Sequence, residues 1–186
     1  MEMFFTIVIS FLIVQRLLEV RLSTKNEAYI IKNGGMEYAP EHFIVMKMLH
    51  TLWFVTMIVE FVLNKPEVSP VLSAICFAGM LLGQTLRYAA IRTLGKRWTV
   101  KIFVLPTAPA VNNGIFKYIK HPNYLGVIIE IFTIPMIFGL TYTAVAFSIA
   151  NALLLVVRIR KEEEILSLKN DYRDRLNQRP RFLPFL

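Results

Sequence analysis

Apolar residues gather into five long segments along the chain instead of alternating with polar ones. The segments are residues 3–22, 43–63, 68–86, 122–139 and 140–157, and the third and fifth contain no charged residue. A helix needs about 20 mainly apolar residues to cross the hydrocarbon core of a bilayer. The pattern therefore predicts an all-α, polytopic membrane protein with about five transmembrane helices. A buried soluble bundle is disfavoured, because soluble bundles keep a polar face on most helices.

The composition agrees with a single membrane domain over residues 1–186. Of the 186 residues, 55% are hydrophobic, and the mean hydropathy is +0.52. We expect residues 1–93 to form the first three helices and residues 94–186 to carry most of the polar chemistry. The first segment is predicted to be a retained helix, because it lacks the basic leader and small-residue cleavage site of a signal peptide. The single cysteine, Cys76, excludes a disulfide framework, and we expect no metal site.

The net charge of +8 follows the connections between the apolar segments. Lysine and arginine are abundant in residues 23–42, 92–121 and 158–186, whereas the short connections 64–67 and 139–142 hold only Lys65. Cytoplasmic loops of membrane proteins carry this excess. We therefore predict an outside N-terminus and a cytoplasmic C-terminus. Membrane topology explains the charge without nucleic acid, and basic patches can also attract anionic lipids.

A first candidate site begins at the fourth apolar segment, in the sequence His121-Pro122-Asn123-Tyr124-Leu125-Gly126. Proline suits the first turn of a helix, which places His121 at the N-terminal mouth. Free N–H groups there favour an anionic ligand, with Lys120 and His121 beside it. We expect Gly126 to let a ligand approach the backbone, with Glu130 one turn deeper. The alternative is that His121 merely caps the helix.

A second polar group lies where the fifth segment leaves the membrane. Arg158 is followed by the acidic residues Glu162, Glu163 and Glu164. Carboxylates here could hydrogen-bond a ribose or balance a cationic cofactor. The alternative is a solvated, charged helix end.

Several ionisable residues interrupt the apolar segments, where burial is costly and usually indicates function. Lys47 and Arg87 lie near helix ends, so their side chains could equally reach the membrane–water interface instead of serving a functional site. Glu130 lies deeper, and we favour a site role for it. Glu60 also lies within an apolar segment, and His50 is expected to be a polar packing residue.

Several motifs together resemble the isoprenylcysteine carboxyl methyltransferase superfamily of integral membrane methyltransferases. They are Leu94-Gly95-x-x-Trp98, Asn113-Gly114-Ile115-Phe116-Lys117-Tyr118-Ile119-Lys120-His121-Pro122-Asn123-Tyr124-x-Gly126, Arg158-x-x-x-Glu162-Glu163-x-x-Leu166, Tyr172, and Arg179-Pro180-Arg181-Phe182-Leu183-Pro184. The resemblance extends from residue 94 to the C-terminus, half of the chain. Lys120 stands where many members have arginine, which keeps the charge but loses the bidentate fork.

The resemblance implies S-adenosylmethionine as methyl donor, bound on the cytoplasmic side. It implies a cofactor site made of Lys120, His121, Pro122, Tyr124, Gly126, Arg158, Glu162 and Glu163, with Lys117, Tyr118 and Leu125 as looser candidates. For the methyl acceptor, Arg87 or Arg92 could hold an ionised group. Glu130 could instead act as a base or hydrogen-bond acceptor for an enolic hydroxyl.

The sequence looks closer to a bacterial branch of the superfamily that O-methylates long-chain alkylpyrones made by type III polyketide synthases. This implies a lipophilic polyketide acceptor and a bacterial inner membrane, with the carboxylate of a prenylated cysteine as the alternative acceptor. Two further alternatives are a membrane reductase with a nicotinamide cofactor and a non-enzymatic membrane protein. Gly79 and Gly83 favour a close helix contact, within one chain or between two, so the oligomeric state stays open.

Overall fold

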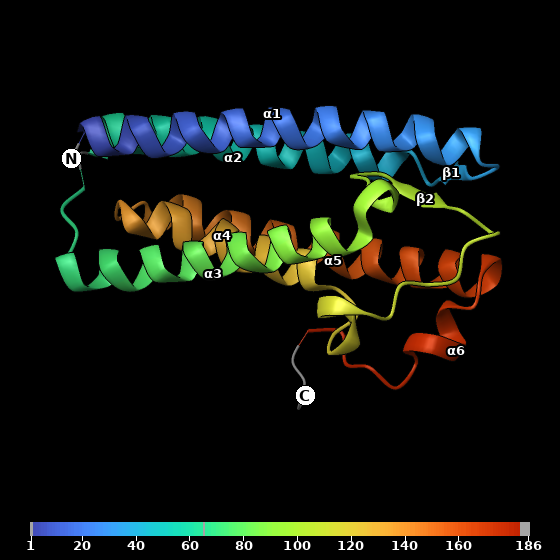
Figure 1. Ribbon diagram of the computed structural model, residues 1–186. Coiled ribbons are helices and arrows are strands. Elements are labelled where there is room, and N and C mark those ends of the chain that lie inside the picture. The colour runs from blue at the N-terminus through green and yellow to red at the C-terminus, as the bar shows by residue number, and fades with distance from the viewer. Residues whose placement is uncertain (1, 65, 183–186) are drawn as a thin grey trace.

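The chain folds into a bundle of long helices, shown as a computed structural model in Figure 1, which describes residues 2–64 and 66–182. In chain order the elements are α1 (Glu2–Lys32), β1 (Met36–Tyr38), α2 (Glu41–Asn64), α3 (Pro70–Leu94), β2 (Ile102–Val104), α4 (Pro122–Ile137), α5 (Thr141–Lys169) and α6 (Tyr172–Leu176), with 3-10 turns at Gly95–Arg97 and Gly114–Lys117. The predicted all-α, polytopic class is confirmed. Lys65, Leu183 and Pro184, which the sequence analysis used, lie outside the described residues.

Four of the helices, α1, α2, α3 and α5, are long and apolar enough to cross a membrane. Helix α4 is also apolar but has 16 residues, a length of about 24 Å. It is enclosed by the longer helices, and it packs most extensively against α3 and α5. Pro135 lies inside its last turn, and the helix ends two residues later. Among the described residues, four helices therefore have the length and hydropathy of a membrane span, and the fourth of the five predicted segments forms a shorter, central apolar helix.

Helix α1 is longer than the apolar pattern predicted, because it continues through residues 23–32, which we expected to be a loop. Two polar residues of this extension, Ser23 and Asn26, are buried against the segment after α3. The Asn26 side chain donates hydrogen bonds to the carbonyl oxygens of Gly95 and Trp98, at 3.2 and 2.7 Å. The Ser23 hydroxyl accepts one from the Val100 N–H at 2.9 Å. Tertiary contacts thus extend a helix that the hydropathy pattern ends early.

A short antiparallel pair of strands was not predicted. Met36 of β1 lies opposite Val104 of β2, and Tyr38 lies opposite Ile102. The approach is close at Gly35, where an added Cβ atom would lie 2.8 Å from the Val104 carbonyl oxygen. The pair joins the α1–α2 connection to the long α3–α4 connection, and both cover the same end of the bundle (Figure 1).

The opposite end of the bundle is closed by aromatic packing and by a helix cap. The rings of Phe5 and Phe61 stack with centroids 3.9 Å apart, and Phe138 packs edge-on against both. Glu60 accepts hydrogen bonds from the backbone N–H groups of Tyr142 and Thr143, at 3.1 and 2.8 Å. This carboxylate, which interrupts an apolar segment, therefore satisfies the N-terminus of α5.

Helices α3 and α4 approach closely at two glycines. A Cβ atom added to Gly126 would lie 2.6 Å from Cγ of Arg87 and 2.7 Å from the carbonyl oxygen of Gly83. A Cβ atom on Gly83 would lie 2.8 Å from Cγ of Glu130. The expectation that Gly126 opens the backbone to a ligand is therefore wrong, because α3 occupies the space beside Gly126. The predicted close contact at Gly83 lies within one chain.

Candidate cofactor and acceptor cavity

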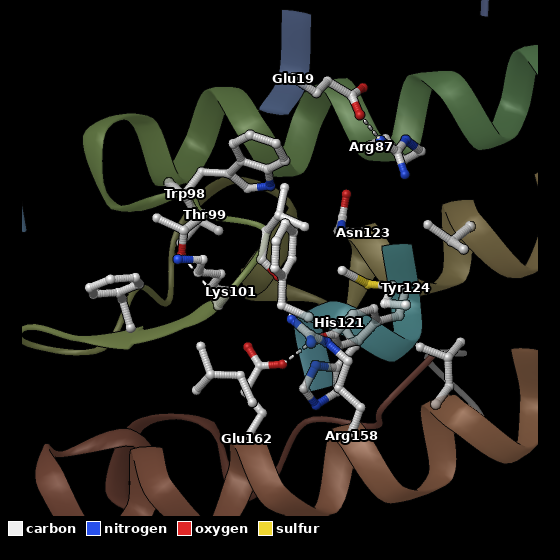
Figure 2. Close-up of a pocket in the computed structure, with 18 of the residues that line it drawn as sticks. Glu19, Arg87, Trp98, Thr99, Lys101, His121, Asn123, Tyr124, Arg158 and Glu162 are labelled. Atoms are coloured by element: carbon white, nitrogen blue, oxygen red, sulfur yellow. Dashed lines mark hydrogen bonds and ion pairs between the residues drawn. The ribbon is translucent and has the colours of Figure 1, made fainter. Parts of the chain in front are cut away.

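A large cavity lies at the end of the bundle that the strand pair covers. Its volume is about 710 Å³, and its walls come from α1 to α6 and from the α3–α4 connection. Figure 2 shows Glu19 and Arg87 at one end of this cavity and Arg158 and Glu162 at the other, with Asn123 between them. We call the first end, among α1, α2 and α3, the deep half, and the second, at the mouth of α4, the mouth half.

Arg158 organises the mouth half. Its Nε atom donates a hydrogen bond to the Tyr124 hydroxyl at 2.8 Å, and its Nη2 atom donates to the Val100 carbonyl oxygen at 2.5 Å. The Tyr124 hydroxyl in turn donates to the Glu162 carboxylate. Arg158 is only 3% exposed. A chain of polar contacts thus links α5 to the first turn of α4 and to the covering loop.

His121 is held from behind by the end of the chain. Its Nε2 atom lies 2.9 Å from Oε1 of Glu163. The Arg181 guanidinium donates to both oxygens of that carboxylate, at 3.0 and 2.6 Å. The backbone N–H of Lys120 donates to the Pro180 carbonyl oxygen at 2.9 Å. Residues after α6 therefore fix the mouth of α4, and Glu163 orients His121 from outside the cavity lining.

Several buried polar atoms that line the mouth half have no hydrogen-bond partner among the described residues. They are Nη1 of Arg158, Oδ1 of Asn123 and the hydroxyl of Tyr172. Burial, and then the nearby carboxylates Glu162 and Glu163, raise the pKa of Tyr172, so this hydroxyl stays protonated. An unpaired buried polar group costs about 1–3 kcal/mol. These three residues are therefore the places in the mouth half where a polar ligand would find unpaired donors and acceptors.

A cluster of four charged side chains borders the deep half. Arg16 donates to Glu130 at 2.5 Å and to Glu19 at 2.8 Å. Arg87 also donates to Glu19, and its Nε atom lies 3.5 Å from Glu130. The two arginines and two glutamates balance one another. Because buried charges need partners, this mutual pairing explains how α1, α3 and α4 can carry charged side chains within an apolar bundle.

Arg16 and Glu19 were not singled out from the sequence, although both belong to this cluster. They interrupt the first apolar segment three residues apart, and residues at that spacing share a helix face. Charged residues that interrupt an apolar segment, as Arg87 does, were therefore the signal by which Arg16 and Glu19 could have been found. Their partners on α3 and α4 could not be assigned from spacing.

The structure brings some of the predicted site residues together and leaves others apart. The cavity lining includes Arg87, Lys120, His121, Pro122, Tyr124, Arg158 and Glu162. It does not include Arg92, Lys117, Tyr118, Leu125, Gly126, Glu130 or Glu163. Of these, Arg92, Lys117 and Tyr118 are exposed, because they lie on the outward side of α3 and of the turn before α4. Glu130 contacts the arginines instead of the cavity.

No metal site is recognisable in the described part of the chain, where no three His, Cys, Asp or Glu side chains gather closely enough to bind an ion.

The fold and the cavity define a polytopic helical membrane protein with a polar and an apolar binding region in one continuous space. The profile of the isoprenylcysteine carboxyl methyltransferase (ICMT) family matches residues 74–168. The chain therefore belongs to this family, and the family implies a membrane methyltransferase. The matched residues include most of the mouth half and Arg87, but not Tyr172, α1 or α2.

Two bacterial proteins are similar over most of their length. "Uncharacterized protein YpbQ" of Bacillus subtilis (strain 168) is 39% identical over 162 residues, which are 87% of this chain and 96% of the relative. A Haemophilus influenzae (strain ATCC 51907 / DSM 11121 / KW20 / Rd) protein, described as "Uncharacterized protein", is 28% identical over 167 residues, 89% of this chain and 96% of the relative. The likeness thus includes the helices that the family profile does not match.

Proposed function

We propose that the protein is an S-adenosylmethionine-dependent O-methyltransferase that acts on a lipophilic acceptor within the membrane. The acceptor we favour is the ring hydroxyl of a long-chain alkylpyrone or a similar polyketide. We further propose a bacterial inner membrane, with the N-terminus outside and the cavity mouth on the cytoplasmic side, where a water-soluble cofactor can enter. Family membership supports methyl transfer over a nicotinamide-dependent reduction or a non-enzymatic role.

The observation that carries the proposal is the chain of contacts from Arg158 through Tyr124 to Glu162, beside the unpaired Nη1 atom of Arg158. When bound, S-adenosylmethionine supplies a methyl group on a positively charged sulfur. The residues of the mouth half fit its other groups. The unpaired Arg158 donor suits the carboxylate of the cofactor. Glu162 suits a cationic or ribose group, and Asn123 offers an unpaired acceptor.

The lining also suits two ligands of different polarity. The mouth half presents Lys120, His121 and Arg158, whereas Phe54, Val55 and Ile58 of α2 line the far part. The alkyl tail of a membrane-dissolved acceptor passes from lipid to an equally apolar lining, so placing it there costs little free energy. A prenylated cysteine has the same kind of tail, and its carboxylate is the alternative acceptor. Methyl transfer is an in-line displacement, so the main task of the cavity is to align the acceptor oxygen with the methyl group.

Calorimetric titration of the detergent-purified protein with S-adenosylhomocysteine tests the cofactor site. We expect the parent to bind, and Glu162→Gln to bind at least about 10-fold more weakly, since one lost charge-assisted contact costs about 1.5–3 kcal/mol. Glu164→Gln is the matched control, because Glu164 is exposed and its one ion pair among the described residues is with Lys161. His121→Ala should also weaken binding. A folded parent that binds neither S-adenosylmethionine nor S-adenosylhomocysteine would refute the proposal.

A further inference from the structure

We infer that the deep half of the cavity binds the acceptor as a neutral hydroxyl compound and that His50 of α2 takes the hydroxyl proton during methyl transfer. The inference rests on the proposed function. It concerns a residue outside the part of the chain that matches the family profile.

The deep half reaches the apolar outer surface between α1 and α2. Leu17 and Val20 of α1 and Val55 and Ile58 of α2 line the cavity, and the same side chains are exposed on the surface of the bundle. Leu17 is 65% exposed and Val55 is 49% exposed. These helices are apolar enough to cross the membrane, so hydrocarbon would surround this surface. An acceptor with an alkyl tail can therefore occupy the deep half while its tail contacts lipid.

The charged cluster that borders the deep half carries no excess positive charge for an ionised acceptor. Arg16 and Arg87 are both engaged by Glu19 and Glu130, and the four charges sum to zero. Lys47 of α2 also lines the cavity, but its side chain is exposed. A bound carboxylate would add a net negative charge in an apolar site, which is costly without a partner. A neutral hydroxyl compound carries no such cost.

The deep half also presents two unpaired hydrogen-bond acceptors. Oδ1 of Asn151 is buried, lines the cavity and has no partner among the described residues. Asn151 precedes Arg158 by two turns of α5, so it lies about 10 Å deeper. The second acceptor is His50. Its Nδ1 atom lies 2.9 Å from the Met46 carbonyl oxygen. A carbonyl only accepts hydrogen bonds, so Nδ1 carries the hydrogen and Nε2 keeps its lone pair.

His50 lines the cavity, and none of its hydrogen bonds to described residues involves Nε2. The charged groups near its ring are Arg16 and Glu19 of α1 and Arg87 of α3, which belong to the neutral cluster. Glu19 and Glu130 are the other basic side chains at this depth among the described residues. Each is paired with both arginines, so they position Arg16 and Arg87 and leave proton transfer to His50.

The reaction balances with His50 as the proton acceptor. The acceptor oxygen forms a bond to the methyl carbon while the carbon–sulfur bond breaks, and the electron pair of that bond stays on sulfur as a neutral thioether. The hydroxyl proton moves to Nε2 of His50, which returns it to water after the products leave. A neutral base is suited to this step, because it can take a proton without first giving up an ion pair.

The test compares two long-chain acceptors that differ in acidity, with S-adenosylmethionine as donor. One is an alkylphenol, whose hydroxyl has a pKa of about 10, and the other is an alkyl carboxylic acid, which is ionised at neutral pH. In His50→Gln we expect kcat for the phenol to fall about 100-fold or more, the usual contribution of a general base. Turnover of the carboxylate, where the parent shows any, should change by less than about 3-fold, since no proton is transferred.

Two controls separate this inference from the proposed function. His42→Gln should leave both reactions unchanged, because His42 does not line the cavity. Titration with S-adenosylhomocysteine should give the same affinity for parent and His50→Gln, which shows that the variant is folded. Unchanged phenol turnover in His50→Gln, or an equal loss with both acceptors, would overturn the role of His50. A parent without cofactor binding would instead refute the proposed function.

Discussion

The close approach of α3 and α4 makes Gly126→Ala an informative substitution. The added methyl group would lie 2.6 Å from Cγ of Arg87 and 2.7 Å from the Gly83 carbonyl oxygen. Ordinary contacts begin at about 3.5 Å, so α4 must move away from α3 by about 0.8 Å. The carbonyl oxygen belongs to the α3 backbone and cannot rotate aside. We expect the two helices to separate locally.

Overpacking of this kind costs about 1–3 kcal/mol. For a chain of this size, each kcal/mol lowers Tm by about 2–4 °C, so we expect a fall of about 2–12 °C. The same movement shifts Tyr124, which lies half a turn before Gly126 and contacts Arg158. Affinity for S-adenosylhomocysteine should therefore fall as well, although Gly126 does not line the cavity.

Thermal unfolding in detergent and calorimetric titration measure both effects. Gly79→Ala is the matched control on α3, because its added methyl group meets only the side chain of Thr133, at 2.7 Å. A threonine side chain can change rotamer, so this variant should lose less stability. The explanation fails if Gly126→Ala unfolds at the temperature of the parent, or if Gly79→Ala is the more damaging change.

Three further predictions concern contacts between distant segments. Glu60→Gln should lower the free energy of unfolding by about 1 kcal/mol, because the cap of α5 loses its charge; unchanged thermal unfolding would contradict this. The Ala110 N–H and Arg175 lower the pKa of Asp171. The contact therefore stabilises the folded protein fully above about pH 4, the pKa of an unfolded aspartate, and this stabilisation is lost as pH falls through the lowered pKa. Hydrogen exchange at Ala110, corrected for intrinsic rates, should accelerate on acidification in the parent but not in Asp171→Asn. Asn26→Ala should make residues 95–112 more sensitive to limited proteolysis, because two carbonyl groups lose their hydrogen-bond donor. Equal cleavage rates in the parent and the variant would exclude this role.

The predicted boundaries were most accurate where a local signal exists. Pro122 begins α4 as its position in the first turn requires, and the apolar run from residue 140 forms α5. The fifth helix nevertheless continues to Lys169, and the first continues to Lys32, well beyond their apolar segments. Hydropathy reports where a helix meets lipid. Whether the helix continues into water depends on partners elsewhere in the chain, such as the backbone carbonyl groups that accept hydrogen bonds from Asn26.

The sequence alone determined the class of this protein, its membrane-spanning segments and most of the mouth half, because these depend on residues close together in the chain. The His121–Pro122 pair and the Arg158–Glu162 spacing are of this kind. Only the tertiary structure decided that Arg16 pairs with Glu130, 114 positions away, and that Gly126 serves helix packing. Such contacts depend on how helices cross and which rotamers fit between them. Spacing within a single helix holds no information about either.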